Sequence, residues 1–423
     1  MDDGPRAADG ALDKLVTVVQ RAGGQNLTAC EVTIVAHDVG SVGGMERVLA
    51  ELAVGLRGRG HDVTVIARTC VLPPDAGVRF HRVRGPARPL IVAHPWFMLA
   101  GTLAVRRWRR GIVQATGAIV LNRVDVIAVH YCHQVGPVGP SRANVLFELH
   151  AKAAGVLKRA SERLCYRPSK AAAFLCVSRG VADEMRESFP ELADRVLTIH
   201  NGVDTNVFAP DVRADDAREL RATLGVGEER LVAAFVGSEW GRKGLGELMH
   251  ALASTPGWDL VVAGSGDRQR YQELADSLGI GGAVHWLGVT PDVQLVYALA
   301  DAFVLPSSYE TFSLVSFEAA ASGVPVLATP VSGVRELIEH GRNGFRISRD
   351  PEEIAGRLAQ LAADPALRAR MGRAARESAL AFSWEEMVTK HVELYSRLDA
   401  GSQPDTDSQA GRHRLIQPTG GQR

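Results

Sequence analysis

Two glutamates, Glu310 and Glu318, lie in the densest cluster of chemistry-bearing residues and are separated by seven positions. The apolar run 303–305 before them predicts a buried strand, and the helix after it is expected to start near 311–313. Free backbone N–H groups at such a start hold phosphate or diphosphate. A carboxylate only accepts hydrogen bonds, so Glu318 suits the vicinal diol of a ribose and Glu310 the hydroxyls of a sugar. The plainer alternative is that Glu310 caps the helix and Glu318 is solvated.

Arg242 and Lys243 form a second cluster, in the glycine-flanked loop 237–244. This loop follows the apolar run 231–236, which we expect to be the first strand of the same domain, so it lies at the same carboxyl edge of the sheet. A planar guanidinium beside a compact ammonium can bind a diphosphate. Alone, the loop could be an ordinary basic loop, but two anion-binding features at one sheet edge favour a phosphate site.

Short β-branched runs alternate with helical patterns along the chain, and this alternation occurs in two successive blocks. Each block indicates a parallel sheet covered by helices, and these sheets position the residues above. The expected strands are 32–35, 63–67, 78–83, 124–129, 174–177 and 196–199, and then 231–236, 259–263, 283–287, 302–305 and 324–328. The first helix is expected to bury one face and to stop at glycine, with Met45, Val48, Leu49, Leu52 and Leu56 followed by Gly58 and Gly60.

The domain organisation follows from this rhythm. The polar interval 201–230 is expected to link two doubly wound domains, at 29–205 and 206–380, and a helical pattern over 384–398 ends the folded part. The segments 1–28 and 399–423 are expected to be mobile. Open α/β sheets bind ligands at the carboxyl ends of their strands, so two such sheets predict a cleft between the domains.

Composition excludes several other classes. A chain of 423 residues with 46% apolar and 23% charged residues is not disordered in bulk. Its 48 Lys and Arg balance its 48 Asp and Glu, so we expect no nucleic-acid partner. Five cysteines without a C-x-x-C pair indicate reduced thiols. The sequence shows no apolar leader and no apolar run near the roughly 20 residues of a membrane span, so a cytoplasmic chain is expected.

Further motifs accompany the two clusters. They are Gly43-Gly44-Met45-Glu46-Arg47-Val48, Val177-Ser178, Ile199-His200-Asn201-Gly202-Val203-Asp204, 322–329, and 336–338 with 343–345. Together with Glu310 and Glu318 they resemble the retaining GT-B glycosyltransferases of family 4, over residues 30–398. The resemblance implies the fold class: α/β, with two Rossmann-like doubly wound domains facing a cleft and a C-terminal helix, 381–398, that crosses back to the first domain.

The resemblance also implies an activity. It is the retaining transfer of a hexosyl unit from a nucleotide-diphosphate sugar to a hydroxyl of a lipid, a saccharide or another acceptor, with no cofactor. The spacing of Arg242 and Lys243 is similar to that of the lipopolysaccharide-type glucosyltransferases, which favours a UDP-sugar, with a GDP-sugar next. Ser238 departs from the arginine that many members carry after this strand, and Arg242 is expected to supply that cation.

Catalytic roles are implied by the resemblance for Lys243, Arg242, Glu310 and His130. Lys243 and Arg242 would hold the diphosphate and Glu310 the donor sugar. His130 follows the expected strand 124–129 and would contact the sugar and the acceptor, with His133 as the reserve. The remaining donor-binding residues are the glycine turn, the helix-start amides and the ribose carboxylate: Gly43, Gly44, Phe312, Ser313, Leu314, Val315 and Glu318.

No metal site is expected. The one Asp-x-Asp pattern, 405–407, lies in the C-terminal tail, where solvated charge is the ordinary interpretation. The turn 264–266 resembles a nicotinamide-binding fingerprint but lacks its third glycine, where Gln269 stands.

Nine arginines and no acidic residue occur between 76 and 124. Five residues close the apolar, aromatic stretch in this interval, namely Arg106, Arg107, Trp108, Arg109 and Arg110. The pattern predicts a helix that meets an anionic membrane, at its inner face, or a lipid- or phosphate-bearing acceptor. The alternative is a core-packed helix whose arginines are solvated.

Two other functions remain compatible with these residues. One is a catalytically silent scaffold that binds sugar nucleotides, although such a protein would be free to lose Lys243, Glu310 and Glu318. The other is a GT-B enzyme that epimerises or phosphorolyses sugars. The sequence does not name the base, the sugar or the acceptor.

Overall fold

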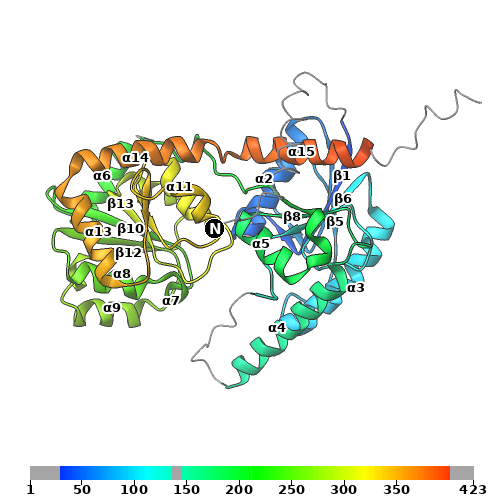
Figure 1. The fold of residues 1–423 in the computed structure, drawn as a ribbon, viewed down its shortest axis with the longest axis horizontal. Helices are drawn as coiled ribbons and strands as arrows, with labels where there is room; N and C mark the ends of the chain where they lie inside the picture. The colour runs from blue at the N-terminus through cyan, green and yellow to red at the C-terminus, as the bar shows by residue number, and fades with distance from the viewer. Residues whose placement is uncertain (1–28, 136–144, 211, 401–423) are drawn as a thin grey trace, which may run out of the picture.

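The computed structural model describes residues 29–135, 145–210 and 212–400, without the side chains of 145–149. Two α/β domains lie side by side, each built on one parallel sheet with helices on both faces (Figure 1). This confirms the predicted fold class. The five cysteines are all free, and Cys132, Cys165 and Cys176 are buried in the first domain.

The sheet of the first domain has seven parallel strands in the order β5-β3-β1-β6-β7-β8-β9. Their bounds are β1 (Glu31–Val35), β3 (Asp62–Ala67), β5 (Arg79–Arg82), β6 (Ile112–Thr116), β7 (Val126–Val129), β8 (Ala173–Cys176) and β9 (Val196–Thr198). A short pair, β2 (Asp38–Val39) and β4 (Thr69–Cys70), stands beside it. The order reverses between β1 and β6, and ligands of such sheets bind outside the carboxyl ends at this switch point.

The sheet of the second domain has six parallel strands in the order β12-β11-β10-β13-β14-β15. Their bounds are β10 (Leu231–Val236), β11 (Trp258–Ala263), β12 (Val284–Gly288), β13 (Ala302–Leu305), β14 (Val326–Ala328) and β15 (Gly344–Arg346). Here the order reverses between β10 and β13. The loops that carry Lys243 and Glu310 follow these two strands, so both lie at the switch point.

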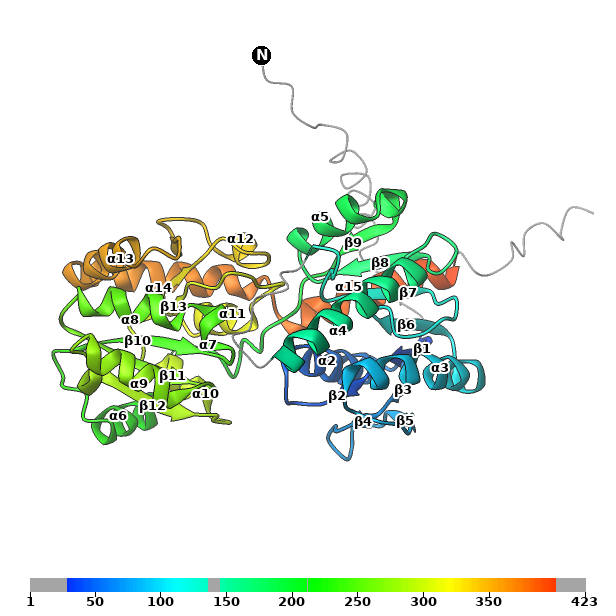
Figure 2. The ribbon, with the colours of Figure 1, turned by 90° about the horizontal axis from the view of Figure 1, so that it is seen from below.

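Helices cover both sheets (Figure 2). In the first domain they are α2 (Gly44–Gly58), α3 (Leu90–Trp108), α4 (Val145–Cys165), α5 (Arg179–Ser188) and η1 (Pro190–Arg195). In the second they are α6 (Ala214–Thr223), α7 (Trp240–Lys243), α8 (Leu245–Ala253), α9 (Arg268–Ser277), η2 (Gly281–Ala283), α10 (Val293–Ala298), α11 (Leu314–Ala321), α12 (Val334–Leu337), α13 (Pro351–Ala363) and α14 (Pro365–Leu380). The predicted face of α2 is buried, and Gly60 takes a φ of 85° after its end. None of the described helices is both long and apolar enough to cross a bilayer.

The sequence predictions were wrong or incomplete at several elements. The interval 201–230 is not a uniform linker, because α6 lies within it and packs against α10. Acidic residues in the first turn of α6 complement the helix dipole, and Ala217 is its buried contact. The strands β6 and β15 and the short pair β2 and β4 were not predicted. Of the segments expected to be mobile, residues 1–28 and 401–423 lie outside the described part of the chain, whereas residues 399 and 400 belong to the last helix.

The last helix, α15 (Trp384–Ala400), crosses back and lies along the first domain (Figures 1 and 2). It packs on α2, where an added Cβ on Gly55 would come within 2.5 Å of Val388, so glycine allows the close approach. The Tyr395 hydroxyl donates to Gln114 Oε1 at 2.8 Å. The chain passes between the domains twice, and the two passages are joined where the Val203 amide donates to the Phe382 carbonyl at 2.7 Å.

Candidate donor site and acceptor cavity

Lys243, Arg242 and Glu310 converge at the switch point of the second sheet. Lys243 Nζ donates to Glu310 Oε1 at 2.8 Å, and Arg242 Nη1 donates to the same oxygen at 3.3 Å. The Ser307 hydroxyl donates to it as well, at 3.1 Å. The structure therefore brings together the two cations and the carboxylate that the sequence singled out. Glu310 is not a helix cap, because Ser313 is the residue that precedes α11 and Glu310 Oε1 is engaged by these side chains.

The position of Lys243 depends on a glycine that leaves room for its side chain. It ends α7, only 11% of its side chain is exposed, and it passes over Gly237. Gly237 has a φ of 138°, and an added Cβ there would lie 2.7 Å from Lys243 Cε. A larger residue would both strain the backbone and displace the lysine.

The N-terminus of α11 presents unpaired amides beside these cations. Ser313, with a φ of 70°, precedes the helix, and its hydroxyl lies 2.9 Å from that of Ser316. Within the described residues, the amides of Leu314 and Val315 have no acceptor. Phe312 is buried and stacks on Phe317 at 4.1 Å between ring centroids, which fixes the turn. Such an arrangement can bind an anion.

Glu318 does not face solvent. Only 7% of its side chain is exposed, and it accepts hydrogen bonds from Arg47 Nη1 at 2.8 Å and from the Tyr297 hydroxyl at 3.1 Å. Arg47 comes from α2, so this ion pair joins the two domains. Burial raises the pKa of Glu318, and the charge of Arg47 opposes that rise. The alternative of a solvated Glu318 is therefore wrong, and its pairing with Arg47 was not predicted.

The glycine turn of the first domain lies against the same helix start. Gly43 has a φ of 98°, and α2 begins at Gly44. An added Cβ on Gly44 would lie 3.6 Å from Leu314 Cδ1, the first residue of α11. Both predicted glycines are thus placed at the boundary between the domains, next to the unpaired amides.

His130 and His133 line one cavity of the first domain, of about 150 Å³. Burial and the charge of His391 lower the pKa of His130 to about 4. His133 Nδ1 lies 2.8 Å from Glu162 Oε1, and the His133 amide donates to the same oxygen at 2.8 Å. Tyr131 connects this cavity to the loop that carries Glu310, because its ring packs edge-on against Tyr309 with centroids 5.2 Å apart.

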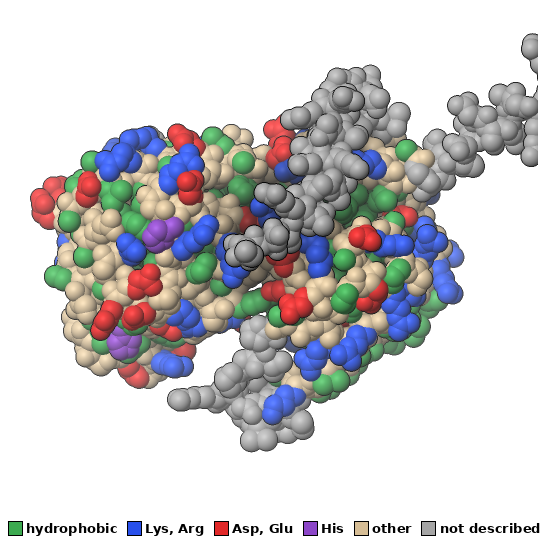
Figure 3. Space-filling model, in the orientation of Figure 1, with side chains coloured by type: hydrophobic (Ala, Val, Ile, Leu, Met, Phe, Trp, Pro, Cys, Tyr) green, Lys and Arg blue, Asp and Glu red, His purple; other side chains and the backbone are tan. Residues whose placement is uncertain are grey.

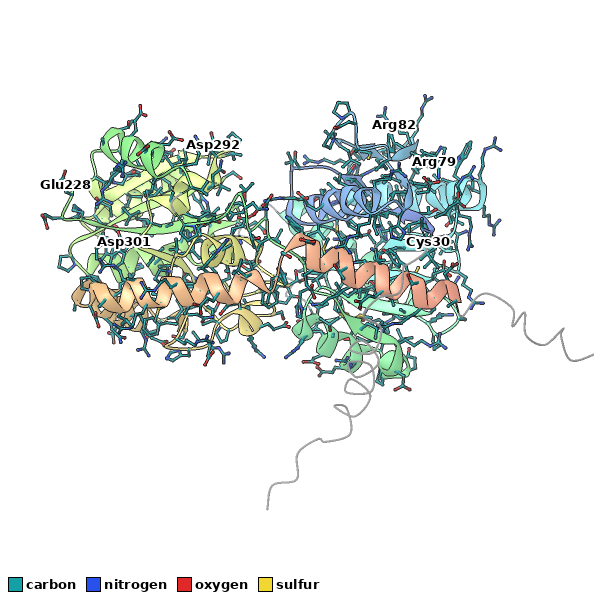
Figure 4. All side chains as sticks on the ribbon, turned by 90° about the horizontal axis from the view of Figure 1, so that it is seen from above. Cys30, Arg79, Arg82, Glu228, Asp292 and Asp301 are labelled. Atoms are coloured by element: carbon teal, nitrogen blue, oxygen red, sulfur yellow. The ribbon has the colours of Figure 1, made fainter. Side chains whose placement is uncertain are left out.

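The arginine-rich segment lies on the outside of the first domain. Figure 3 shows Lys and Arg side chains gathered along its outer edge, and Figure 4 shows Arg79 and Arg82 of β5 there. The helix α3 ends at Trp108, so Arg109 and Arg110 lie beyond it. Trp96, Leu99 and Leu103 are 50%, 59% and 56% exposed. The opposite face, which includes Phe97 and Val105, is buried, so α3 is core-packed on one side only.

No group of three or more potential metal ligands occurs among the described residues, and 405–407 lies outside them. The turn 264–266 lies beside the loop after β10 instead, because the Ser265 hydroxyl lies 2.8 Å from that of Ser238.

Two parallel-sheet domains that face each other, with cations and helix amides at one switch point, define a glycosyltransferase of the GT-B type. The family model described as "Glycosyltransferase Family 4" matches residues 42–207, and the one described as "Glycosyl transferases group 1" matches residues 216–378. The chain belongs to glycosyltransferase family 4. It is a glycosyltransferase enzyme, which sets aside the silent scaffold.

Curated relatives and solved structures agree with this family assignment. The chain is 30% identical over 398 residues to the D-inositol 3-phosphate glycosyltransferase of Thermomonospora curvata, covering 84% of this chain and 91% of the relative. It is 27% identical over 383 residues to an uncharacterized glycosyltransferase of Methanocaldococcus jannaschii, covering 84% and 94%. The structure of WaaG, a glycosyltransferase involved in lipopolysaccharide biosynthesis, matches with a TM-score of 0.71 at 21% identity, over 86% of this chain and 99% of that one. HepE from Anabaena in complex with UDP-glucose matches with a TM-score of 0.68 at 20% identity, over 87% and 100%.

Proposed function

We propose that this protein is a retaining hexosyltransferase that takes its sugar from a nucleotide-diphosphate sugar, preferably a UDP-sugar, with a GDP-sugar as the second choice. The observation that carries the proposal is the meeting of Lys243, Arg242 and Glu310 beside the unpaired amides of α11. Support for UDP comes from the structural likeness to HepE, which was solved with UDP-glucose. The acceptor is a hydroxyl of a lipid, a saccharide or another molecule.

The proposed chemistry is electrostatic. When the bond between the sugar and the diphosphate breaks, negative charge builds on the leaving diphosphate. Lys243, Arg242 and the helix amides stabilise that charge, and each such preorganised donor is worth about 3 kcal/mol of the barrier. This requires that Lys243 exchanges its partner Glu310 for the diphosphate when the donor binds, so that the Glu310 carboxylate can also accept hydroxyls of the sugar. No metal is assigned a role in this proposal.

Calorimetric titration with UDP, GDP, ADP and TDP, without added metal, tests the donor site. We expect one nucleotide to bind, and Lys243→Ala to weaken it by about 100-fold. Glu310 keeps Arg242 and Ser307 as partners in this variant, so the fold should be unchanged. Lys390→Ala, which removes a partly exposed lysine of α15 that is likewise paired with a glutamate, Glu386, is the matched control. If no nucleotide binds, or if Lys243→Ala binds as the parent does, the donor assignment is wrong.

The stereochemistry is tested on the product. Incubation with the nucleotide sugar that binds, followed by proton NMR of the glycoside, should show the anomeric configuration of the donor preserved. An inverted product would refute the retaining mechanism. A donor that is converted without any glycoside being formed would identify the epimerase or phosphorylase alternative.

We further propose that the first domain rests on an anionic membrane at its inner, cytoplasmic face. Val92, Trp96, Leu99 and Leu103 follow one another at helical spacing on the exposed face of α3, and each is at least half exposed. The same face continues into the basic last turn of the helix. An apolar stripe that ends in arginines matches the interior and the charged surface of an anionic bilayer.

Co-sedimentation with vesicles that contain anionic lipid tests this surface. We expect binding that weakens with salt and that is lost when Arg106, Arg107, Arg109 and Arg110 are all changed to Gln. The matched control changes four exposed arginines of the second domain to Gln, namely Arg268, Arg270, Arg370 and Arg373. Equal sedimentation of both variants and the parent would refute membrane binding through this segment, while leaving the donor site unaffected.

A further inference from the structure

A second, smaller cavity lies between the sheet of the first domain and the helices α2 and α15. Its volume is about 20 Å³, which is room for one water molecule. Four polar side chains line it, namely Gln114 of β6, His130 after β7, Asn201 after β9 and His391 of α15. His130 also lines the cavity of about 150 Å³, so it stands between the two cavities.

The four polar side chains leave hydrogen-bonding groups unused among the described residues. His391 Nδ1 donates to a backbone carbonyl of its own helix at 2.8 Å, so Nε2 is a free acceptor. Gln114 Oε1 accepts from the Tyr395 hydroxyl, which leaves the N–H groups of the Gln114 amide free. The side chains of His130 and Asn201 form no hydrogen bond to any described residue. The small cavity thus contains donors and acceptors that face no protein partner.

These groups are too deeply buried for bulk water to satisfy them. Asn201 is 7% exposed and His391 is 5% exposed. Asn201 is also held in place, because an added Cβ on the next residue, Gly202, would lie 2.5 Å from the Trp384 amide nitrogen. Buried polar groups are nearly always paired, and an unpaired one is costly. Polar cavities of this size hold an ordered water, whereas apolar ones stay dry.

We propose that one water molecule in this cavity, bound by His391, Asn201 and Gln114, holds the His130 ring in one orientation and one tautomer. This inference rests on the proposed function, since His130 is the histidine expected to contact the sugar and the acceptor. The water donates to His391 Nε2 and accepts from the Gln114 amide. Its other proton and lone pair serve the His130 ring and the Asn201 amide, one as acceptor and the other as donor. Ring and amide therefore constrain each other through the water.

The water makes the C-terminal helix part of the site. His391 and Asn201 line the small cavity but not the larger one, so each acts on the reaction only through His130. Both are therefore positioning residues. A ring that is held from behind presents one defined nitrogen, donor or acceptor, to the larger cavity.

A crystal structure of the whole protein, at a resolution that shows ordered water, tests the cavity directly. We expect one water oxygen about 2.7–3.2 Å from His391 Nε2 and from a ring nitrogen of His130. A cavity without a water peak would overturn the proposal. So would a direct hydrogen bond between the two histidines.

Nitrogen NMR of the His130 ring reports its tautomer at pH 7, where the ring is neutral because its pKa is lowered to about 4. We expect one tautomer in the parent and a mixture in His391→Leu, which keeps the bulk but has no acceptor. His391→Gln restores an acceptor oxygen and should restore one tautomer. Ile199→Val trims an apolar side chain of the same cavity and is the matched control, with unchanged shifts. The same tautomer in the parent and in His391→Leu would refute the positioning role.

Asn201→Ala perturbs the water from its other side and should give the same mixture, so the test does not depend on one variant folding. Calorimetry with UDP should give the affinity of the parent for His391→Leu. The kcat for release of UDP from the donor sugar should fall about tenfold or more, at an unchanged KM for the donor. An unchanged kcat would remove the role in the reaction. If UDP does not bind the parent, the proposed function falls, and crystallography and NMR still decide whether the water holds His130.

Discussion

Arg47→Met tests the ion pair that joins the two domains. Arg47 Nη1 donates to Glu318 Oε1 at 2.8 Å, and the remaining partner of this carboxylate is the Tyr297 hydroxyl. Methionine keeps most of the length and the apolar stem of arginine but has no charge. The substitution therefore leaves a buried carboxylate with one neutral donor.

The expected cost follows from the geometry. Removing one partner of a fully buried ion pair costs about 3–5 kcal/mol. Arg47 is 27% exposed on its side chain, so water already screens the pair, and Glu318 can take up a proton. We therefore expect a loss of about 2 kcal/mol at pH 7. For a domain of this size, that lowers the melting temperature by about 4–8 °C.

The cost depends on pH with a definite sign. The pKa of Glu318 is already raised by burial, and removing Arg47 removes a group that lowers it, so the pKa rises further. A carboxyl with a raised folded pKa contributes stability below its unfolded pKa and loses it as the pH rises through the folded value. The difference between the parent and Arg47→Met should thus be largest at neutral pH and shrink as the pH falls towards 5.

A double-mutant cycle with Glu318→Gln isolates the pair, measured by scanning calorimetry at both pH values. In the Gln background no buried charge is left unpaired, so Arg47→Met should cost less than it does in the parent. Equal effects of Arg47→Met in both backgrounds, or a destabilisation that grows as the pH falls, would refute this account of the interface.

Two other substitutions test single contacts. Gly237→Ala should weaken nucleotide binding about tenfold, because its Cβ would displace Lys243. The control is Gly257→Ala: Gly257 has a φ of 93° and open space around it, so this variant should show backbone strain without loss of binding. Calorimetric titration with the nucleotide compares the two variants. Tyr395→Phe should lower the free energy of unfolding by about 1–2 kcal/mol, because it leaves Gln114 Oε1 buried and unpaired. The urea midpoint should fall at a constant slope, and an unchanged midpoint would contradict the prediction.

The donor cluster could be predicted because its residues are local in sequence. Each lies within a few positions of a strand end, and the pattern of buried strands is strong enough to place both loops at one sheet edge. Strand β6 was missed because Gln114 interrupts its apolar run. Its side chain is nevertheless buried, since it accepts the hydrogen bond from Tyr395, which is remote in sequence. No local pattern could indicate that partner.

The cavity of the first domain and the Arg47 pair were missed for the same physical reason. His37, Thr116 and Lys158 come from three distant segments, and each alone is compatible with an ordinary surface or core position. Arg47 occupies a helical position where a solvated arginine is the usual expectation, and its partner lies in the other domain. Such pairings depend on how the two domains sit against each other, which short-range spacing does not encode.

The contacts between the domains divide into two kinds with different consequences. Beside Lys243 and Glu310 they include several polar ones: besides the Arg47 pair, the Tyr309 hydroxyl donates to Glu184 at 3.2 Å and the Arg179 amide to Glu336 at 2.7 Å. Polar contacts of this kind exchange for water or ligand at little net cost. The α15 face on α2 is apolar, so separating those helices would expose buried surface at about 25 cal/mol per Å². We therefore expect α15 to stay with the first domain when the cleft opens or closes. The backbone should bend where the chain passes between the domains. A donor ribose that competes with Arg47 for Glu318 would then break one of the polar contacts that hold the two domains together.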